Sequence, residues 1–196
     1  MARKPPLIEL VHPISKQQFG VIAKAVRKAG YGAAIRWSEN IEPPANAREF
    51  AGEAIYVICN SGMKNSVALG IFEKRMAALH LGQSCKTVFG HLGKSSAIDH
   101  IWLNRVMLFR RYLKADDPIE FCSTLPWVGP ITKYHLAKNF GANVAKPDVH
   151  LLRLAKADDT TAQELCERLA LETGFRAATV DLILWRACAD GIIHSR

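Results

Sequence analysis

Apolar residues recur at helical spacing along almost the whole chain, and this periodicity is the feature that most limits its fold. Phe19, Ile22 and Val26 share one helical face near the N-terminus, and Val180 and Ile183 do so near the C-terminus. No two segments that alternate between polar and apolar residues are joined by a hairpin turn, and the chain has no internal repeat. The sequence therefore predicts an all-α protein.

Capping residues divide the periodic stretches into separate helices. The last helix, over about residues 179–190, is apolar on most sides, so we expect it to be deeply buried. A polar break at residues 59–64 interrupts an apolar stretch, and residues 82–93 are rich in loop-forming residues. The predicted helix starts are Ser15 with Gln18, Asn46 with Glu49, Ser96, Asp117, Asp148 and Thr161 with Glu164, and the predicted ends are Gly30, Gly141 and Gly174.

The charge balance favours an anionic partner. The 196 residues include 26 Lys and Arg and 18 Asp and Glu, which gives a formal net charge of +8. With 49% hydrophobic residues, the chain can bury a core as one domain or as two small lobes. Nucleic acid is the first candidate partner and a membrane surface the second, because charge alone does not separate the two.

Membrane spans, targeting segments and metal sites are not predicted. No apolar run approaches the ~18 residues of a membrane span, and the apolar stretch after the basic N-terminus is too short for a signal peptide. The five cysteines include no C-x-x-C pair, which indicates reduced thiols in an intracellular protein rather than disulfides or a zinc site. No pair of histidines has the spacing of metal ligands.

The segment Leu125-Pro126-Trp127-Val128-Gly129-Pro130 predicts a tight turn between two helices. Gly129 is expected to adopt a backbone conformation closed to other residues, and Pro130 to preset the first helical turn. Such a turn directs unpaired N–H groups outward at a helix N-terminus, where one phosphate can bind. The alternative is an ordinary connection between two helices.

This turn and a second segment resemble the helix-hairpin-helix DNA glycosylase superfamily. The family carries a hairpin of the form L-P-G-V-G-x-K-T-A, and further along the chain V-D-x-H-x-x-R-(V/L). Here the matching residues run from Leu125 to Thr132 and from Pro147 to Leu154. The match is close over these two segments, and residues 53–68 more loosely resemble an apolar helix followed by the family's wedge loop.

The resemblance implies that Asp148 is the catalytic carboxylate. Base excision breaks an N-glycosidic bond through a cation-like sugar, which a carboxylate near the anomeric carbon stabilises while it orients or deprotonates water. Pro147 places Asp148 at a helix N-terminus, where the helix dipole favours its ionised form. The alternative is that Asp148 only caps its helix.

One position departs from the family pattern. Members that also cleave the strand use a lysine two residues after the hairpin glycine, and Ile131 occupies that position here. Lys133 lies about 200° further around the helix, so it should not substitute easily. The resemblance therefore implies a monofunctional enzyme that uses water as its nucleophile, with Lys138 and Lys146 as alternative amines.

The resemblance also implies contacts with duplex DNA. Relatives insert a side chain of the wedge loop into the gap that an extruded base leaves. Tyr31 and Trp37, expected in an N-terminal loop, are candidates for the base pocket, whereas Trp102 and Trp185 are expected in the core. The candidate DNA-binding residues are Leu125, Trp127, Gly129, Ile131 and Thr132 in the hairpin, His150 after it, and Asn60, Ser61, Met63 and Lys64 in the wedge loop.

These observations combine into one expectation. The resemblance implies a two-lobed helical fold with a cleft between the lobes: residues 46–142 form one lobe, and residues 1–45 plus 143–196 form the other. The expected activity is excision of a damaged or modified base from double-stranded DNA by a monomer, in the cytoplasm near the nucleoid, or in the nucleus of a eukaryote. No metal or other cofactor is expected, apart from a monovalent cation that the hairpin carbonyls can bind. The alternatives are a non-catalytic helix-hairpin-helix DNA-binding protein and a helical protein–protein adaptor.

Overall fold

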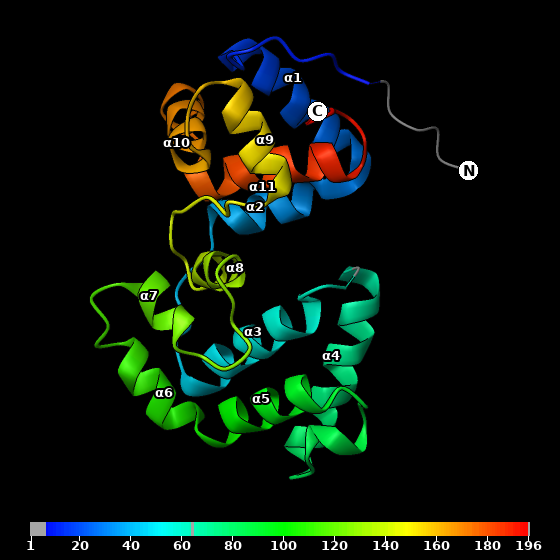
Figure 1. The fold of residues 1–196 in the computed structure, drawn as a ribbon, viewed down its shortest axis with the longest axis vertical. Coiled ribbons are helices and arrows are strands. Elements are labelled where there is room, and N and C mark those ends of the chain that lie inside the picture. Colours follow the sequence, from blue (N-terminus) through cyan, green and yellow to red (C-terminus); the bar gives the residue numbers. More distant parts are fainter. Residues whose placement is uncertain (1–6, 64, 196) are drawn as a thin grey trace. The chain divides into compact units, whose positions relative to one another are not determined.

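Every regular element of residues 7–63 and 65–195, the part of the chain that the computed structural model describes, is a helix (Figure 1). The side chains of residues 65 and 66 are outside this description. The all-α prediction is therefore confirmed. The chain divides into two compact units, which we call unit 1 (Met1–Ile41 with Asn143–Arg196) and unit 2 (Glu42–Ala142).

Unit 1 packs around its last helix. Its elements are α1 (Lys16–Val26), the π-helix η1 (Arg27–Tyr31), α2 (Gly32–Glu39), α9 (Val149–Ala157), α10 (Ala162–Thr173) and α11 (Ala177–Ala189). Helix α11 contacts α1, α2, α9 and α10. Val180, Ile183, Leu184 and Ala187 on α11 are fully buried, which confirms the burial predicted from its apolar sequence.

Unit 2 is built on α3 and an aromatic cluster. Its elements are α3 (Ala47–Asn60), α4 (Asn65–His80), the 3-10 helix η2 (Cys85–Thr87), α5 (Leu92–Leu103), α6 (Arg105–Tyr112), α7 (Pro118–Ser123) and α8 (Thr132–Asn139). Helix α3 contacts α4, α5, α6 and α8. The buried Phe50 ring on α3 lies 5.0–6.0 Å from the rings of Phe109, Tyr112, Phe121 and Phe140.

Most helix starts follow from local capping bonds, as predicted. Asn46 Oδ1 accepts hydrogen bonds from the N–H groups of Arg48 and Glu49, and Thr161 with Glu164 forms a complete capping box. Ser15 and Asp117 cap α1 and α7 in the same way. These bonds connect residues two or three positions apart, so the local sequence is enough to predict them.

The predicted helix start at Ser96 is wrong. Helix α5 begins at Leu92, because the His91 imidazole accepts a hydrogen bond from the N–H of Lys94. Helices α5 and α6 are separate because Asn104 leaves the helical geometry (φ −96°, ψ 10°), and its side-chain amide donates to the carbonyl of His100 at 2.9 Å. The amide thus competes with the helix for a backbone group.

The N-terminal loop expected around Tyr31 and Trp37 is also wrong. Gly30 has φ 101° and kinks the chain, but the helical path resumes at once in α2. Tyr31 ends η1 and Trp37 lies within α2. The glycine bends the chain here without ending the helical segment.

Candidate functional site

The predicted turn between α7 and α8 is present in unit 2, and we call residues 125–131 the hairpin. Leu125 and Val128 are buried and anchor it, and the N–H of Val128 donates to the carbonyl of Leu125 at 3.2 Å. The carbonyl of Gly129 accepts from the N–H of Lys133 at 3.0 Å, which starts the helical turn that leads into α8. The Leu125 side chain therefore stabilises the fold and leaves only its backbone for a ligand.

The strained residue of the hairpin is Trp127, and the prediction for Gly129 is wrong. Trp127 has φ 66°, in the left-handed region, whereas Gly129 has no positive φ. The glycosylase hairpin pattern has glycine at the position of Trp127, which suits this conformation. The turn demands a left-handed residue at that position, and here a tryptophan fills it at a cost of about 1–2 kcal/mol.

Trp127 packs onto the start of α5. Its ring lies so close to Gly93 that a Cβ built there would be 2.5 Å from the indole. Its centre is 5.0 Å from the His91 ring in an edge-to-face arrangement, and 44% of the residue remains exposed. The structure thus presents a half-exposed aromatic surface within the hairpin, packed against the start of α5.

The first turn of α8 has no side-chain cap from the described residues. Ile131, at the N-cap position, is exposed, and Thr132 is half-buried. The N–H of Lys133 already donates to the carbonyl of Gly129, and first-turn N–H groups without such a backbone partner remain available for water or an anion. Lys133 forms an ion pair with Glu120 on α7, with an Nζ–Oε1 distance of 2.7 Å. This hydrogen bond raises the pKa of the Lys133 ammonium.

The predicted wedge loop follows α3 in unit 2. Asn60 ends α3, and its side-chain amide donates to the carbonyl of Tyr56 at 3.3 Å. The carbonyl of Ser61 accepts a 2.5 Å hydrogen bond from Nζ of Lys94, and burial lowers the pKa of this ammonium. Met63 is half-buried, and Lys64 lies outside the described residues. The buried Lys94 ammonium therefore holds the backbone of this loop, a contact that the sequence does not predict.

Asp148 lies in unit 1, where both of its carboxylate oxygens have partners. Oδ1 accepts hydrogen bonds from the N–H groups of His150 at 3.0 Å and Leu151 at 3.2 Å, so Asp148 caps α9. Oδ2 lies 3.0 Å from Nζ of Lys146. The Asp148 side chain is 14% exposed and that of Lys146 is 20% exposed. A carboxylate held in this way is fixed in orientation and paired with a single lysine.

Aromatic rings and a second cation extend this site. Nζ of Lys146 lies 5.2 Å from the centre of the Trp185 ring, and the Arg186 guanidinium lies 4.6 Å from the same ring. The guanidinium is also 4.5 Å from the Tyr31 ring. Burial and a hydrogen bond with Asp190 raise the pKa of the Tyr31 hydroxyl. We call Asp148, Lys146, Trp185, Arg186 and Tyr31 the carboxylate site.

The structure brings only some of the predicted residues of unit 1 together. Tyr31 joins the carboxylate site through Arg186, whereas Trp37 is exposed on α2 and has no contact with it among the described interactions. His150 directs Nδ1 to the hydroxyl of Ser195 at 3.1 Å. Burial raises the pKa of the nearby Cys188 thiol to about 11, so it stays protonated at neutral pH.

Trp185 and Arg186 are the functional candidates that sequence reasoning missed. Trp185 was expected in the core because it lies in an apolar helix, yet it is only half-buried and contacts two cations. Trp102, by contrast, is buried as expected. Lys146 lies two residues before Asp148 in the sequence, but nothing local links Lys146 or Asp148 to Trp185.

Comparisons with protein-family models, with curated proteins and with solved structures found no match to this chain. Within the described residues, no group of three or more His, Cys, Asp or Glu side chains could hold a metal ion. In the same part of the chain, no helix has both the length and the apolar character needed to cross a membrane.

Proposed function

We propose that the protein is a monofunctional DNA glycosylase that extrudes a damaged or modified base and hydrolyses its N-glycosidic bond with Asp148. The observation that carries this proposal is the position of Asp148, whose Oδ1 is fixed by two N–H groups of α9 while Oδ2 pairs with Nζ of Lys146 at 3.0 Å. The uncapped start of α8 beside the hairpin supports a phosphate contact. The family's two-lobed architecture, with a cleft between the lobes, is part of the proposal.

Asp148 acts on the sugar in this mechanism. The bond between C1′ and the base nitrogen breaks and its electron pair leaves with the base, so positive charge develops on the sugar. Oδ2 stabilises this charge and accepts a proton from the attacking water, whose oxygen forms the new bond to C1′. The departed base anion takes up this proton from Asp148 through solvent, which regenerates the carboxylate. The products are the free base and an intact strand with an abasic site.

Lys146 has to release Oδ2 before Asp148 can do this. A DNA phosphate offers the ammonium a second anionic partner, and the Trp185 ring, 5.2 Å from Nζ, stabilises the cation. The ion pair thus protects a partly buried carboxylate until the substrate arrives. Lys146 is a positioning residue in this mechanism.

The absence of lyase chemistry rests on two side chains. Ile131 occupies the position of the family's amine, and its side chain is exposed. Lys133, the next lysine along α8, is paired with Glu120 at 2.7 Å. Water is therefore the proposed nucleophile, and Lys146 is the alternative amine because it lies 3.0 Å from Asp148.

The proposed partner is double-stranded DNA that contains a modified base, bound by a monomer near the nucleoid or in a nucleus. No cofactor is proposed, apart from a monovalent cation at the hairpin carbonyls. The second candidate function is a non-catalytic helix-hairpin-helix DNA-binding protein. It is favoured by the engagement of both Asp148 oxygens, because a carboxylate that only caps a helix would have the same partners.

A panel of duplexes, each with one modified base, tests the proposal. The candidates are oxidised guanine, alkylated purines, deaminated pyrimidines and bulky modified pyrimidines, and free base is measured under single-turnover conditions. We expect base release from at least one duplex, strands that break only after hot alkali, and no covalent complex after borohydride treatment. Duplex binding without any base release would favour the non-catalytic protein.

Two variants make the borohydride result interpretable. Ile131→Lys restores an amine at the family position, and trapping by this variant would show that the assay detects a Schiff base. Trapping by the wild type that is lost in Lys146→Met, but kept in Lys133→Met, would instead assign the amine to Lys146.

A further inference from the structure

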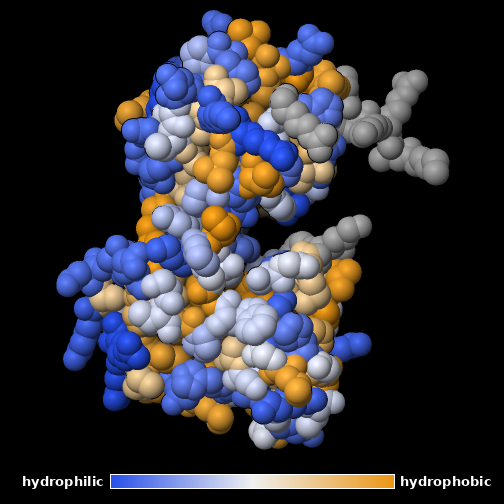
Figure 2. Space-filling model, viewed as in Figure 1, coloured by the Kyte–Doolittle hydropathy of each residue, from blue (hydrophilic) through white to orange (hydrophobic). Residues whose placement is uncertain are grey.

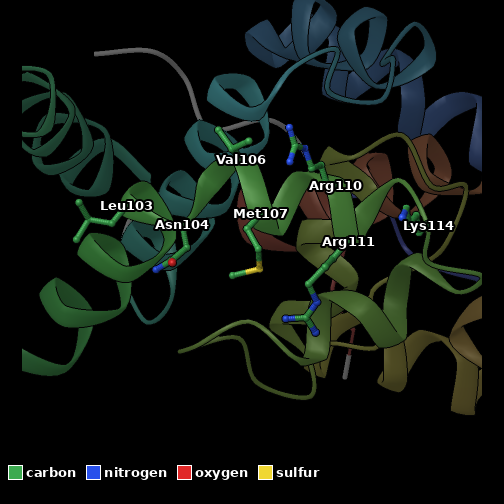
Figure 3. A pocket seen from close by; sticks show the side chains of 7 residues that line it. All are labelled: Leu103, Asn104, Val106, Met107, Arg110, Arg111 and Lys114. Atoms are coloured by element: carbon green, nitrogen blue, oxygen red, sulfur yellow. The ribbon is translucent and has the colours of Figure 1, made fainter.

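The outer surface of α6 in unit 2 combines exposed apolar and basic side chains. An open hollow of about 400 Å³ is lined by Leu103, Asn104, Val106, Met107, Arg110, Arg111 and Lys114, which we call the α6 surface (Figure 3). Met107 and Arg111 point to one side of the helix, and Val106 and Arg110 point to the other. The hollow is therefore apolar at the end near Leu103 and basic at the end near Lys114.

The core of unit 2 does not need these apolar side chains. Helix α6 already packs inward through Leu108, which is buried, and through Phe109 and Tyr112 in the aromatic cluster. Leu103 is nevertheless 77% exposed, and Met107 is 45% exposed. An apolar patch next to charged residues is typical of an interaction surface.

The basic end has no acidic partner. Among the described residues, Arg110, Arg111 and Lys114 form no ion pair. Hydrophilic side chains project at the lower left of Figure 2, where Figure 1 places α6 and α7, with apolar atoms between them. Three unpaired cations beside three exposed apolar side chains call for a ligand that carries both negative charge and apolar groups.

We infer that the α6 surface binds an acidic protein segment that carries apolar side chains. Helix α6 (Arg105–Tyr112) is about 12 Å long, a length that roughly four residues of an extended peptide cover. Apolar side chains of the segment cover Leu103, Val106 and Met107, and its carboxylates pair with Arg110, Arg111 and Lys114. This function is independent of base excision.

Two other occupants fit the surface less well. A DNA backbone would satisfy the cations through phosphate contacts but would leave the apolar half against polar phosphodiesters. A second copy of this chain would bring together two molecules of formal charge +8, with like charges at the basic end. The acidic segment is the occupant that complements both halves.

Fluorescence anisotropy with labelled peptides tests the inference. The probe alternates aspartate and leucine, and two control peptides replace either every leucine by serine or every aspartate by lysine. We expect only the probe to bind, with a Kd of about 1–100 µM. Arg111→Glu and Met107→Ser should each weaken binding at least about fivefold, whereas Arg48→Glu, a matched charge reversal on α3, should not.

Three results would overturn the inference. The first is equal binding of the serine peptide, which would make the contact purely ionic. The second is no peptide binding together with a loss of duplex affinity in Arg111→Glu, which would assign the surface to nucleic acid. The third is concentration-dependent dimerisation that Met107→Ser abolishes. Circular dichroism of each variant establishes that it folds, and base release by the same variants should be unchanged.

Discussion

In unit 1 the Asp148 carboxylate is engaged by two N–H groups and a lysine, whereas in unit 2 the first turn of α8 has no side-chain cap from the described residues. The first site is closed by internal partners, and the second is open to an external anion. A ligand of the Asp148 carboxylate has to displace an existing partner, whereas a ligand of the uncapped helix start does not. This difference matches the two proposed roles, chemistry on a bound substrate at the carboxylate site and retention of any duplex at the hairpin.

Each unit also contains a partly buried carboxylate, and the two carboxylates have different partners. Asp148 in unit 1 has Lys146 at 3.0 Å. Among the described residues, Glu53 in unit 2 has one polar side-chain partner, the amide of Asn139, which donates at 3.0 Å, and burial raises the pKa of Glu53. A cation can hold a partly buried carboxylate in its charged form, and an amide does so less well.

The largest expected effect is that of Asp148→Asn. The amide keeps most of the cap on α9, so the stability loss should be about 1 kcal/mol. Base release should fall by about 10²–10³, because the negative charge opposite the cationic sugar is lost. Single-turnover base release measures this, and Asp117→Asn is the matched control, because Asp117 caps α7 with the same two-bond geometry. Equal rates for Asp148→Asn and the wild type would leave Asp148 as a helix cap only.

Substitutions at two glycines of unit 2 distinguish an effect on stability from an effect on duplex binding. Gly141 has φ 91°, and a Cβ there would lie 3.2 Å from the backbone nitrogen of Pro43, so Gly141→Val should cost about 2 kcal/mol or more. Gly129 has an ordinary φ and open space, so Gly129→Val should change stability by less than about 0.5 kcal/mol. Urea denaturation compares the two variants.

Binding by Gly129→Val completes this comparison. The branched side chain hinders the approach of a phosphate to the start of α8, so affinity for plain and modified duplexes should fall by a similar factor. Unchanged affinity for both duplexes in this folded variant would show that the hairpin is not a phosphate site.

Trp127 tests whether the strain in the hairpin serves binding. Trp127→Gly removes the left-handed strain of about 1–2 kcal/mol but also removes the contacts with His91 and Gly93, so the net change in stability should be under about 1 kcal/mol. Duplex affinity should fall about tenfold, because an exposed aromatic surface beside the proposed phosphate site is lost. Trp127→Phe should keep most of the affinity. Tighter binding by Trp127→Gly would mean that the tryptophan only obstructs the turn.

Lys146→Met removes the other partner of the Asp148 ion pair. Methionine keeps an apolar stem on Trp185 and removes the charge, so stability should fall by about 1 kcal/mol. The salt dependence of duplex binding should lose about one unit of slope, while Asp148→Asn should bind duplex as well as or better than the wild type. If the ion pair were purely structural, Lys146→Met and Asp148→Asn would not change duplex affinity in opposite directions. Anisotropy titrations at several salt concentrations measure both effects.

The sequence predicts those features that depend on near neighbours. The all-α class follows from periodicity, and the caps at Ser15, Asn46 and Thr161 follow from bonds over two or three residues. Asp148 at the start of α9 is a local feature of the same kind. Its position was therefore predictable, whether it caps a helix or acts on a sugar.

Features that depend on distant contacts were missed. The left-handed residue was assigned to Gly129 by local propensity, but the buried Leu125 and Val128 fix the turn so that Trp127 adopts that conformation. Trp185 lies far from Lys146 in the sequence, and only the packing of unit 1 brings them to 5.2 Å. Tertiary packing overrides local preference at both places.

The smallest expected effect is that of Glu53→Gln. Because burial raises the pKa of Glu53 in the folded state, its protonated form stabilises the fold, and that contribution is complete below the ordinary pKa of 4.5. It is lost as the pH rises through the raised folded-state pKa, so the wild type should lose stability at this site as the pH rises above 4.5. Glutamine keeps an oxygen for the Asn139 amide and does not ionise, so the variant should be more stable at pH 7, by less than about 1 kcal/mol. Urea unfolding at both pH values measures the difference, and the exposed Glu42→Gln serves as the control. If the stability difference between Glu53→Gln and the wild type did not grow with pH, Glu53 would be as well compensated by its amide as Asp148 is by its lysine, and the contrast between the two units would disappear.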